Sequence, residues 1–521
     1  MNSSRIFAAV SIAAAITAAS IFSASAESTE IRKGGTLTVA LPQSISTMDY
    51  TKTTIQHETN CLSQVCEALF IRSNDLNEYI PYLATEWSVS DDGLTYYFTL
   101  RDDVYFSNGR KMTAADVQYS YDRTKLPAST QDFARGYYES TDILDDTHIA
   151  VHLSQPCAPF MSYVASTSGS IVPQEEVEAA GDDWGRGTLI GTGPFILNKF
   201  VTDEYVLFEK NPNYWGEEPN VDAIKVVFIT DPVQIYNAIR TGDVHLGFDL
   251  SGDALPQAQE AGVLQQTPSS AINWVKFNLN NGPTADIRVR KALMMAVDTE
   301  EMNEGIYQYG EAANIFLPLP PSQFAYDESL SEYKVEYDPE GAKELLKEAG
   351  YGKGLELNLY FPISSNRNKM GQILQSYYDD IGVKLNIISS STPEWVATTV
   401  GSHSGSTVNL SAAAWNGSPD PAFFVQRFFH SKFMNNVSNT GGYGRDGVDA
   451  LLDEAFSVTD IETRRADYRK VMEIALQDYT GYYYSCELRN FGVNQKVHGF
   501  APRGDNRLLV CSPLNNIWLE Q

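Results

Sequence analysis

Residues 83–117 read LATEWSVSDDGLTYYFTLRDDVYFSNGRKMTAADV, and their pattern indicates the class of fold. Apolar and polar residues alternate over 94–100, which is the period of a half-buried strand. A turn at Asp91-Asp92-Gly93 precedes this strand. Thr113 and Asp116 have the spacing of a capping box, which predicts that a helix begins there. A strand and a helix in so short a run indicate an α/β fold.

The same alternation of strands and helices extends outward on both sides. Strands are expected at 35–41, 147–153, 204–208, 223–229, 272–279 and 383–388. Helices are expected at about 56–69, 113–125, 231–241, 286–297, 338–349, 370–381, 448–456 and 463–479. The helix that ends at Gly382 leads into the strand at 383–388, which is typical of a parallel crossover unit. We see no repeat or low-complexity linker, so domain boundaries are expected where the chain crosses between packed lobes.

The length and charge of the chain narrow the classes of function. A chain of 521 residues is long enough for two or three domains. It carries 38 Lys and Arg against 66 Asp and Glu, a net charge of −28, which argues against a surface for nucleic acid. Hydrophobic residues make up 43% of the chain, which is too apolar for a disordered protein.

The N-terminus has the pattern of a secretory signal peptide. Arg5 precedes the apolar stretch 6–22, and Ala24-Ser25-Ala26 is a small-residue cleavage site, so we expect 1–26 to be removed. An uncleaved membrane anchor is the alternative. The first cysteine is Cys61, which argues against lipidation of the mature N-terminus. The mature protein is therefore expected to be soluble and periplasmic.

The five cysteines leave the disulfide pattern open. In an oxidising compartment they allow one or two disulfides and at least one free thiol. Cys61 and Cys66 lie in a predicted helix, where a spacing of five places them too far apart around the turn. Cys486 and Cys511 are the first pair to test, since both lie in the C-terminal segment.

Motifs of catalysis and metal binding are weak or missing. The chain has no His-Glu-x-x-His motif, no Walker loop and no nucleophile elbow. Residues 442–447 match a dinucleotide fingerprint by letter, but they follow a polar loop and are expected to form a turn before a helix. His148 and His152 share one strand face and are expected to be solvated rather than bound to a metal. We therefore predict no catalytic residue, no metal site and no cofactor.

Many motifs in order along the chain resemble those of the family 5 bacterial extracellular solute-binding proteins, which are dipeptide, oligopeptide or nickel receptors of ABC importers. The matching segments are Gly34–Leu37, Met48-Asp49, Leu83–Trp87, Ser90–Tyr96, Leu100–Gly109, Thr113–Val117, Ile171–Pro173, Gly191–Phe195, Asn211–Trp215, Asp286–Leu293, Ala296–Asp298 and Asp420-Pro421. Most of them are turns and helix caps, so they indicate the fold rather than the ligand.

The resemblance implies a two-lobed, periplasmic-binding-protein-like α/β fold of type II, cluster C, with an extra subdomain inserted in the first lobe. Lobe I is expected to hold 27–271 and 488–521, and lobe II 272–487, with hinge strands near Trp274 and Glu487. The lobes are expected to close around a solute and then dock on the permease subunits and their ATPases. A monomer is expected.

The resemblance also points to the loop that follows an apolar strand at 412–415. Peptide-binding relatives carry an aspartate, three residues after the tryptophan that is Trp415 here, that pairs with the α-ammonium group of the ligand. Ser418 occupies that position. Asp420 matches a later helix cap of the family. If the loop here differs in length by one residue, Asp420 takes the place of the aspartate that pairs with the ligand. Trp415, next to Asn416, is expected to stack on a ligand, with core packing as the alternative.

A second set of candidates is expected to face the cleft from other segments. Arg367 lies near the position at which peptide-binding relatives offer an arginine to a ligand carboxylate, and a guanidinium suits a planar anion. The alternative for Arg367 is a solvated loop charge. Thr54, Arg135, Ser168 and Trp274 lie in segments that are expected to line the cleft.

Two classes of function remain open at this point. The favoured one is a receptor, without catalysis, for a short peptide or peptide-like solute. The alternative ligand is a non-peptide solute such as an opine, a sugar conjugate or a metal chelate, which the serine at position 418 favours. A sensory receptor or a secreted enzyme is a further alternative.

Overall fold

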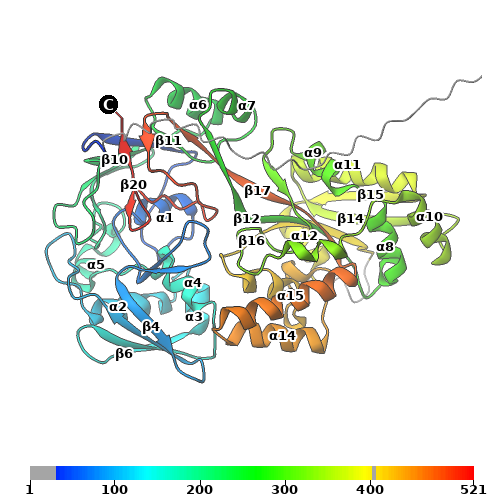
Figure 1. The fold of residues 1–521 in the computed structure, drawn as a ribbon, viewed down its shortest axis with the longest axis horizontal. Helices are drawn as coiled ribbons and strands as arrows, with labels where there is room; N and C mark the ends of the chain where they lie inside the picture. The colour runs from blue at the N-terminus through cyan, green and yellow to red at the C-terminus, as the bar shows by residue number, and fades with distance from the viewer. Residues whose placement is uncertain (1–30, 402–406, 521) are drawn as a thin grey trace, which may run out of the picture.

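The computed structural model describes residues 31–401 and 407–520 (Figure 1). The predicted signal peptide at 1–26 lies outside the described residues. No helix within the described residues is long and apolar enough to cross a membrane. Strands and helices alternate around one large sheet, which confirms the predicted α/β class.

The large sheet has eleven strands, parallel and antiparallel ones among them. Ten strands follow each other in the spatial order β15 (Val383–Ser390), β14 (Leu355–Pro362), β16 (Leu410–Asn416), β12 (Leu264–Phe277), β17 (Gly481–Val493), β11 (Leu246–Gly247), β1 (Thr36–Leu41), β10 (Ala223–Phe228), β9 (Tyr205–Lys210) and β8 (Phe195–Val201). The eleventh, β13 (Ala312–Asn314), pairs with β17 outside this order. β1 is parallel to β10 and β11, and β14 is parallel to β15 and β16.

The remaining strands form smaller sheets. A four-stranded antiparallel sheet has the order β4 (Ala84–Val89), β5 (Thr95–Leu100), β7 (His148–Leu153) and β6 (Tyr138–Ile143). Three two-stranded ribbons are β2 (Phe70–Arg72) with β3 (Tyr79–Pro81), β18 (Val497–His498) with β21 (Trp518–Leu519), and β19 (Cys511–Ser512) with β20 (Asn515–Asn516).

Fifteen α-helices lie in the described residues. They are α1 (Gln56–Leu62), α2 (Ala114–Asp122), α3 (Asp132–Tyr137), α4 (Phe160–Val164), α5 (Gln174–Ala180), α6 (Pro232–Thr241), α7 (Ala254–Glu260), α8 (Ile287–Met295), α9 (Thr299–Ile306), α10 (Pro339–Glu348), α11 (Ser365–Asp380), α12 (Thr392–Thr399), α13 (Val425–Phe429), α14 (Asp446–Ser457) and α15 (Ile461–Gln477).

Two long antiparallel strands, β12 and β17, link the two ends of this sheet (Figure 1). The start of β12, Leu264–Pro268, pairs with 488–492, next to β11. Its later part, Ile272–Lys276, pairs with 481–486 and also with β16. The register shifts between Pro268 and Ile272, where the ladder is interrupted. The chain therefore passes between the two ends of the sheet along this strand pair.

Separate hydrophobic cores lie on the two sides of the crossing strands. We call the part that contains β1–β11 and β18–β21 the first lobe, and the part that contains α8–α15 and β13–β16 the second lobe. The first lobe packs one core around β1 and β10, and a second core around the β4-β5-β7-β6 sheet. The second lobe packs its cores around β14 and around α13–α15. The expected division at 271/272 and 487/488 falls within the crossing strands.

The lobes also touch away from the crossing strands. Phe133 in α3 packs on Phe423 at 5.3 Å between ring centroids, and Tyr137 packs on Phe456 of α14 at 5.5 Å. The amide of Ala158 donates to the carbonyl of Phe456 at 2.8 Å. In Figure 1, α3 lies beside α14. Helix α3 of the first lobe thus contacts the second lobe through aromatic side chains.

Several local predictions are confirmed. The alternating run forms β5, and Thr113 and Asp116 form the capping box at the start of α2. Gly242 ends α6 with φ of 85°, a left-handed conformation that favours glycine. β14, α11 and β15 form the predicted parallel crossover. The strand predicted from 272 begins eight residues earlier, at Leu264.

The helix predicted over 56–69 is wrong at its C-terminal end, since α1 ends at Leu62. The loop with the sequence Gly191-Thr192-Gly193-Pro194-Phe195 takes up the backbone beyond it. The amide of Gly193 donates to Val65 O at 2.8 Å, and that of Phe195 donates to Gln64 O at 3.1 Å. These carbonyls therefore bond to a distant segment instead of continuing the helix.

No disulfide joins the cysteines, all five of which lie in the described residues as buried free thiols. Cys486, in the core of the second lobe, donates to Ser269 O at 3.4 Å. Cys511, in the core of the first lobe, donates to Glu217 O at 3.3 Å. The pair selected from the sequence is therefore wrong, because the two thiols belong to different lobes.

The close contact between the 191–195 loop and Val65 leaves no room for a side chain at Gly191. A Cβ added at Gly191 would overlap the Val65 carbonyl oxygen, whereas a Cβ at Gly136, exposed in α3, meets nothing within 4 Å. We expect Gly191→Ala to lower the free energy of unfolding by about 1–3 kcal/mol. Urea unfolding followed by circular dichroism measures this. Gly136→Ala is the control, and equal stability of the two variants would contradict the packing described.

Candidate functional site

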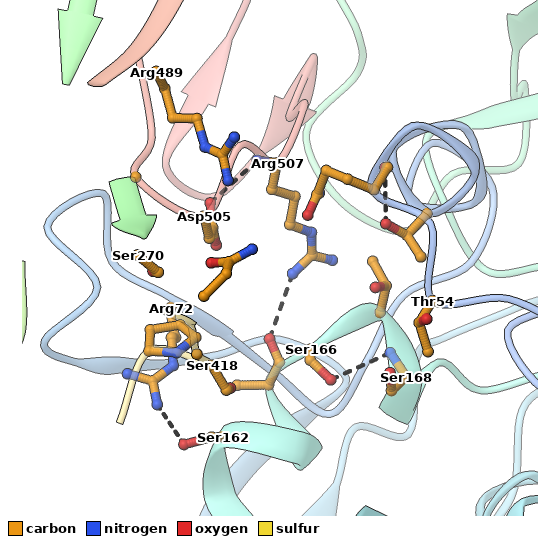
Figure 2. Close-up of a pocket in the computed structure, with 18 residues that line it drawn as sticks. Thr54, Arg72, Ser162, Ser166, Ser168, Ser270, Ser418, Arg489, Asp505 and Arg507 are labelled. Atoms are coloured by element: carbon orange, nitrogen blue, oxygen red, sulfur yellow. Dashed lines mark hydrogen bonds between the residues drawn. The ribbon is translucent and has the colours of Figure 1, made fainter. Parts of the chain in front are cut away.

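A polar pocket lies between the two lobes, beside the crossing strands (Figure 2). It has a volume of about 210 Å³. The first lobe contributes Thr54, Gln56, Thr59, Arg72, Ser162, Ala165, Ser166, Thr167, Ser168, Gly504, Asp505 and Arg507, and the opposite wall and the crossing strands contribute Ser270, Asn416, Gly417, Ser418, Pro419 and Arg489. Both lobes are therefore needed to form the pocket.

Arg72, at the end of β2, lines the first-lobe wall of the pocket. Its Nη1 donates to Leu76 O at 2.5 Å, and its Nη2 donates to Ser162 Oγ at 2.6 Å and to the Tyr79 hydroxyl at 2.8 Å. The guanidinium also lies 4.6 Å from the centre of the Tyr79 ring. These contacts hold the charge of Arg72 in place at the pocket wall.

Arg507 and Asp505 come from the C-terminal segment of the chain. Arg507 Nη1 donates to Ala165 O at 3.4 Å (Figure 2). Burial, followed by the nearby charge of Arg503, lowers the pKa of Arg507 below its ordinary value. Asp505 accepts two bonds from Arg503, at 3.0 and 2.8 Å. Burial is the largest single effect on the pKa of Asp505 and raises it, but Arg503 and Arg507 together lower it by a larger amount, so the net shift is downward and this carboxylate stays ionised.

Arg489 projects from β17 beside a second carboxylate. Its Nη1 lies 4.0 Å from Asp249 Oδ1. Asp249 also accepts from Asn506 Nδ2 at 3.2 Å and lies 3.3 Å from His57 Nε2. Burial lowers the pKa of His57, against the opposing effect of Asp249, which favours the neutral imidazole. Asp249 therefore offsets part of the charge of Arg489 outside the pocket lining.

The wall contributed by the second lobe is neutral. Asn416 ends β16, and the amide of Gly417 donates to Ser270 O at 3.3 Å. The amide of Asp420 donates to Ser418 O at 2.7 Å, which closes the turn after β16. This wall therefore offers hydroxyl, amide and backbone groups, while the charged groups stand on the first lobe and on β17.

The pocket brings together four of the residues proposed from the sequence. Thr54 and Ser168 lie on the first-lobe wall, and Asn416 and Ser418 lie on the opposite wall. Ser168 is held by its amide, which donates to Ser166 Oγ at 3.2 Å. Three segments that are far apart in sequence thus meet at one site.

The other proposed residues do not line this pocket. Trp415 Nε1 donates to Phe423 O at 2.6 Å and its ring packs edge-on against Phe428. Asp420 is buried, pairs with Arg464 at 2.7 Å and caps the turn at Ala422 with a bond of 2.9 Å. These two side chains stabilise the second lobe.

Three further residues also lie elsewhere. Arg367, in the first turn of α11, donates to Pro362 O at 3.3 Å. Trp274 is fully buried in β12, with Lys276 Nζ 4.7 Å from its ring centre. Arg135, exposed on α3, pairs with Asp132 and donates to Ser129 O at 3.1 Å.

Four residues that line the pocket were not predicted from the sequence: Arg72, Arg489, Arg507 and Ser270. Arg72 follows the buried pair Phe70-Ile71, and Arg489 lies within a long strand that is buried on both sides of it, so both charges occur in mostly buried strands. A charge that interrupts a buried segment is uncommon and is a signal for a partner or a site. Arg507 is near in sequence to Arg503 and Asp505, but only the fold shows that this cluster faces α4.

No group of three or more His, Cys, Asp and Glu side chains within residues 31–401 and 407–520 is arranged to hold a metal ion. His148 instead lies 2.9 Å from Asp145 through Nδ1, and His152 Nε2 lies 2.9 Å from Asp142.

Comparison with known proteins gives three findings. The family model described as "Bacterial extracellular solute-binding proteins, family 5 Middle" matches residues 78–436. The chain is 27% identical over 432 residues to the dipeptide-binding protein of Escherichia coli K12, covering 77% of this chain and 79% of the relative. It is 29% identical over 425 residues to heme-binding protein A of Haemophilus influenzae, covering 76% of each.

A solved structure has the same fold. HbpA2 from Haemophilus parasuis superposes with a TM-score of 0.86 at 23% sequence identity, over 94% of this chain and 100% of that one. At 23% identity this likeness shows that the fold is shared over nearly the whole chain, and it says nothing about the ligand.

The buried pair of Asp420 and Arg464 predicts a loss of stability. Asp420→Ala leaves the guanidinium buried without its partner, so we expect the free energy of unfolding to fall by about 3–5 kcal/mol. Urea unfolding measures this fall. Asp132→Ala, which breaks the exposed pair with Arg135, is the control and should leave stability unchanged. A stable Asp420→Ala protein that has lost only ligand binding would instead place Asp420 in the site.

Proposed function

We propose that this chain, which belongs to the bacterial extracellular solute-binding proteins of family 5, is the receptor of an ABC importer and captures a short peptide between its lobes. The observation that carries the proposal is the pocket, whose walls come from both lobes and which lies beside the only strands that link them within the large sheet of the described residues. A solute that bridges such walls favours their closure, since it binds the closed form better than the open one.

The chemistry of the walls supports a peptide. Asn416, Ser418 and Ser168 offer polar groups that complement peptide amides and carbonyls, and Arg507 and Arg489 offer guanidinium groups suited to a carboxylate. The Escherichia coli relative is named for dipeptides, whereas the Haemophilus influenzae relative is named for heme. The small polar side chains around this pocket favour the peptide.

The interrupted ladder supports a hinge between the lobes. The shift of register between Pro268 and Ile272 leaves this part of the crossing pair with fewer ladder bonds than its neighbours. We place lobe I at 27–271 and 488–521 and lobe II at 272–487, so that bending is concentrated here. Closure then carries the 416–419 loop toward Ser168.

The receptor role has consequences for location and partners. The protein acts in the periplasm as a monomer after removal of residues 1–26. The closed form delivers its cargo to the transmembrane subunits of a permease that is driven by its ATPases. It performs no chemistry on the cargo.

Calorimetry with di- and tripeptides tests the proposal, with hemin as the comparison ligand. We expect saturable binding of a peptide, without breakdown of it, and no comparable binding of hemin. Binding of hemin alone would overturn the peptide assignment.

A variant that fills the pocket tests its position. Ser418→Trp places an indole in the pocket wall, so we expect peptide affinity to fall at least tenfold with an unchanged circular dichroism spectrum. Ser331→Trp, at an exposed position of the second lobe, is the control and should bind as the parent does. Undiminished affinity of the Ser418 variant would move the binding site elsewhere.

A further inference from the structure

The charges of the pocket are unequal, and this bears on the choice of cargo. Three arginines, Arg72, Arg489 and Arg507, line it, and Asp505 is its one carboxylate among the lining residues that the structure describes. The chain as a whole carries a net charge of −28. The pocket therefore carries an excess of positive charge although the protein as a whole is strongly acidic.

The one carboxylate of the lining is already occupied. Asp505 forms a bidentate ion pair with Arg503, and the backbone amide of Arg507 donates to its carboxylate at 3.2 Å. An ammonium group of a ligand would have to compete with Arg503 for these oxygens. Asp249, the other carboxylate nearby, contacts Arg489, His57 and Asn506 and does not line the pocket.

The arginines, in contrast, keep donors without acceptors. Arg507 is 8% exposed, and its Nε has no hydrogen-bond partner among the described residues. Three further buried groups also have no hydrogen-bond partner within the described part of the chain: the Nε of Arg489, the Nε of Arg72 and the hydroxyl of Ser270. Buried polar groups without partners are costly, and donors of this kind are satisfied by acceptor oxygens.

We propose that the cargo is an anionic peptide, one with more carboxylates than ammonium groups, whose carboxylates bind Arg507 and Arg489. This inference rests on the peptide-receptor function proposed above. Arg72 is tied to Leu76, Tyr79 and Ser162, so it contributes mainly its charge. The neutral wall formed by Asn416–Pro419 contacts the peptide backbone and adds no charge of its own.

A matched set of tripeptides tests the proposal by calorimetry at low salt. We expect Ala-Glu-Ala to bind at least tenfold more tightly than Ala-Ala-Ala, and Ala-Lys-Ala to bind most weakly. N-acetylation of Ala-Glu-Ala, which removes the ammonium group, should preserve or raise affinity. Equal binding of the acidic, neutral and basic peptides would overturn the anionic preference but leave the peptide receptor intact. Binding of none of them would overturn both.

Arginine variants test the assignment of the carboxylate site. Arg507→Gln should weaken binding of Ala-Glu-Ala at least tenfold and reduce its advantage over Ala-Ala-Ala. Arg489→Gln, at a side chain that is 24% exposed, is the second variant should Arg507→Gln fail to fold by circular dichroism. Arg240→Gln, exposed on α6, is the control. If folded Arg489 and Arg507 variants keep the parental preference, the assignment is wrong.

Discussion

The antiparallel pairing of β12 with β17 is the constraint on which the rest of the molecule depends. β17 runs from the core around β14 into the core around β1 and β10, and β12 runs from Leu264, which packs on the core of α6 and α7, into the core around β14. The ladder between the two strands therefore fixes how the two lobes face each other. The pocket lies beside this ladder, and one of its arginines projects from β17. The same pairing that joins the lobes therefore also positions a charge of the pocket.

The distribution of charge follows the division into walls. The arginines stand on the first lobe and on β17, and the 416–419 loop of the second lobe is neutral. One wall thus supplies strong electrostatic attraction and the other supplies hydrogen bonds with little field. In the function proposed above, a solute settles on the charged wall first and is covered by the neutral one without meeting a second set of charges.

Local signals predicted the elements well, and the long-range arrangement escaped them. The capping box at Thr113 and the alternation over 94–100 depend on neighbours in sequence, and both are confirmed. The end of α1 depends on a loop more than a hundred residues away, which no local pattern reveals.

The site shows the same limit. Thr54, Ser168, Asn416 and Ser418 were predicted through the likeness to a family, and they do line the pocket. Arg507 lies at the far end of the chain, where only its return to the first lobe brings it to α4. Whether a charge faces a cleft or a core is decided by tertiary contacts, as the burial of Asp420 against Arg464 illustrates.

The buried thiols have a consequence for how this protein is made. Burial raises the pKa of Cys486 and of Cys511 to about 12, and it also raises the pKa of the other three, so all five thiols stay protonated at neutral pH. A protonated, inaccessible thiol neither attacks a disulfide nor forms one. Among its five cysteines, all of which the structure describes, the native fold therefore contains no disulfide that a reductant could break, and its thiols are poorly placed to form one. Refolding it requires no oxidant, and reductants leave it intact.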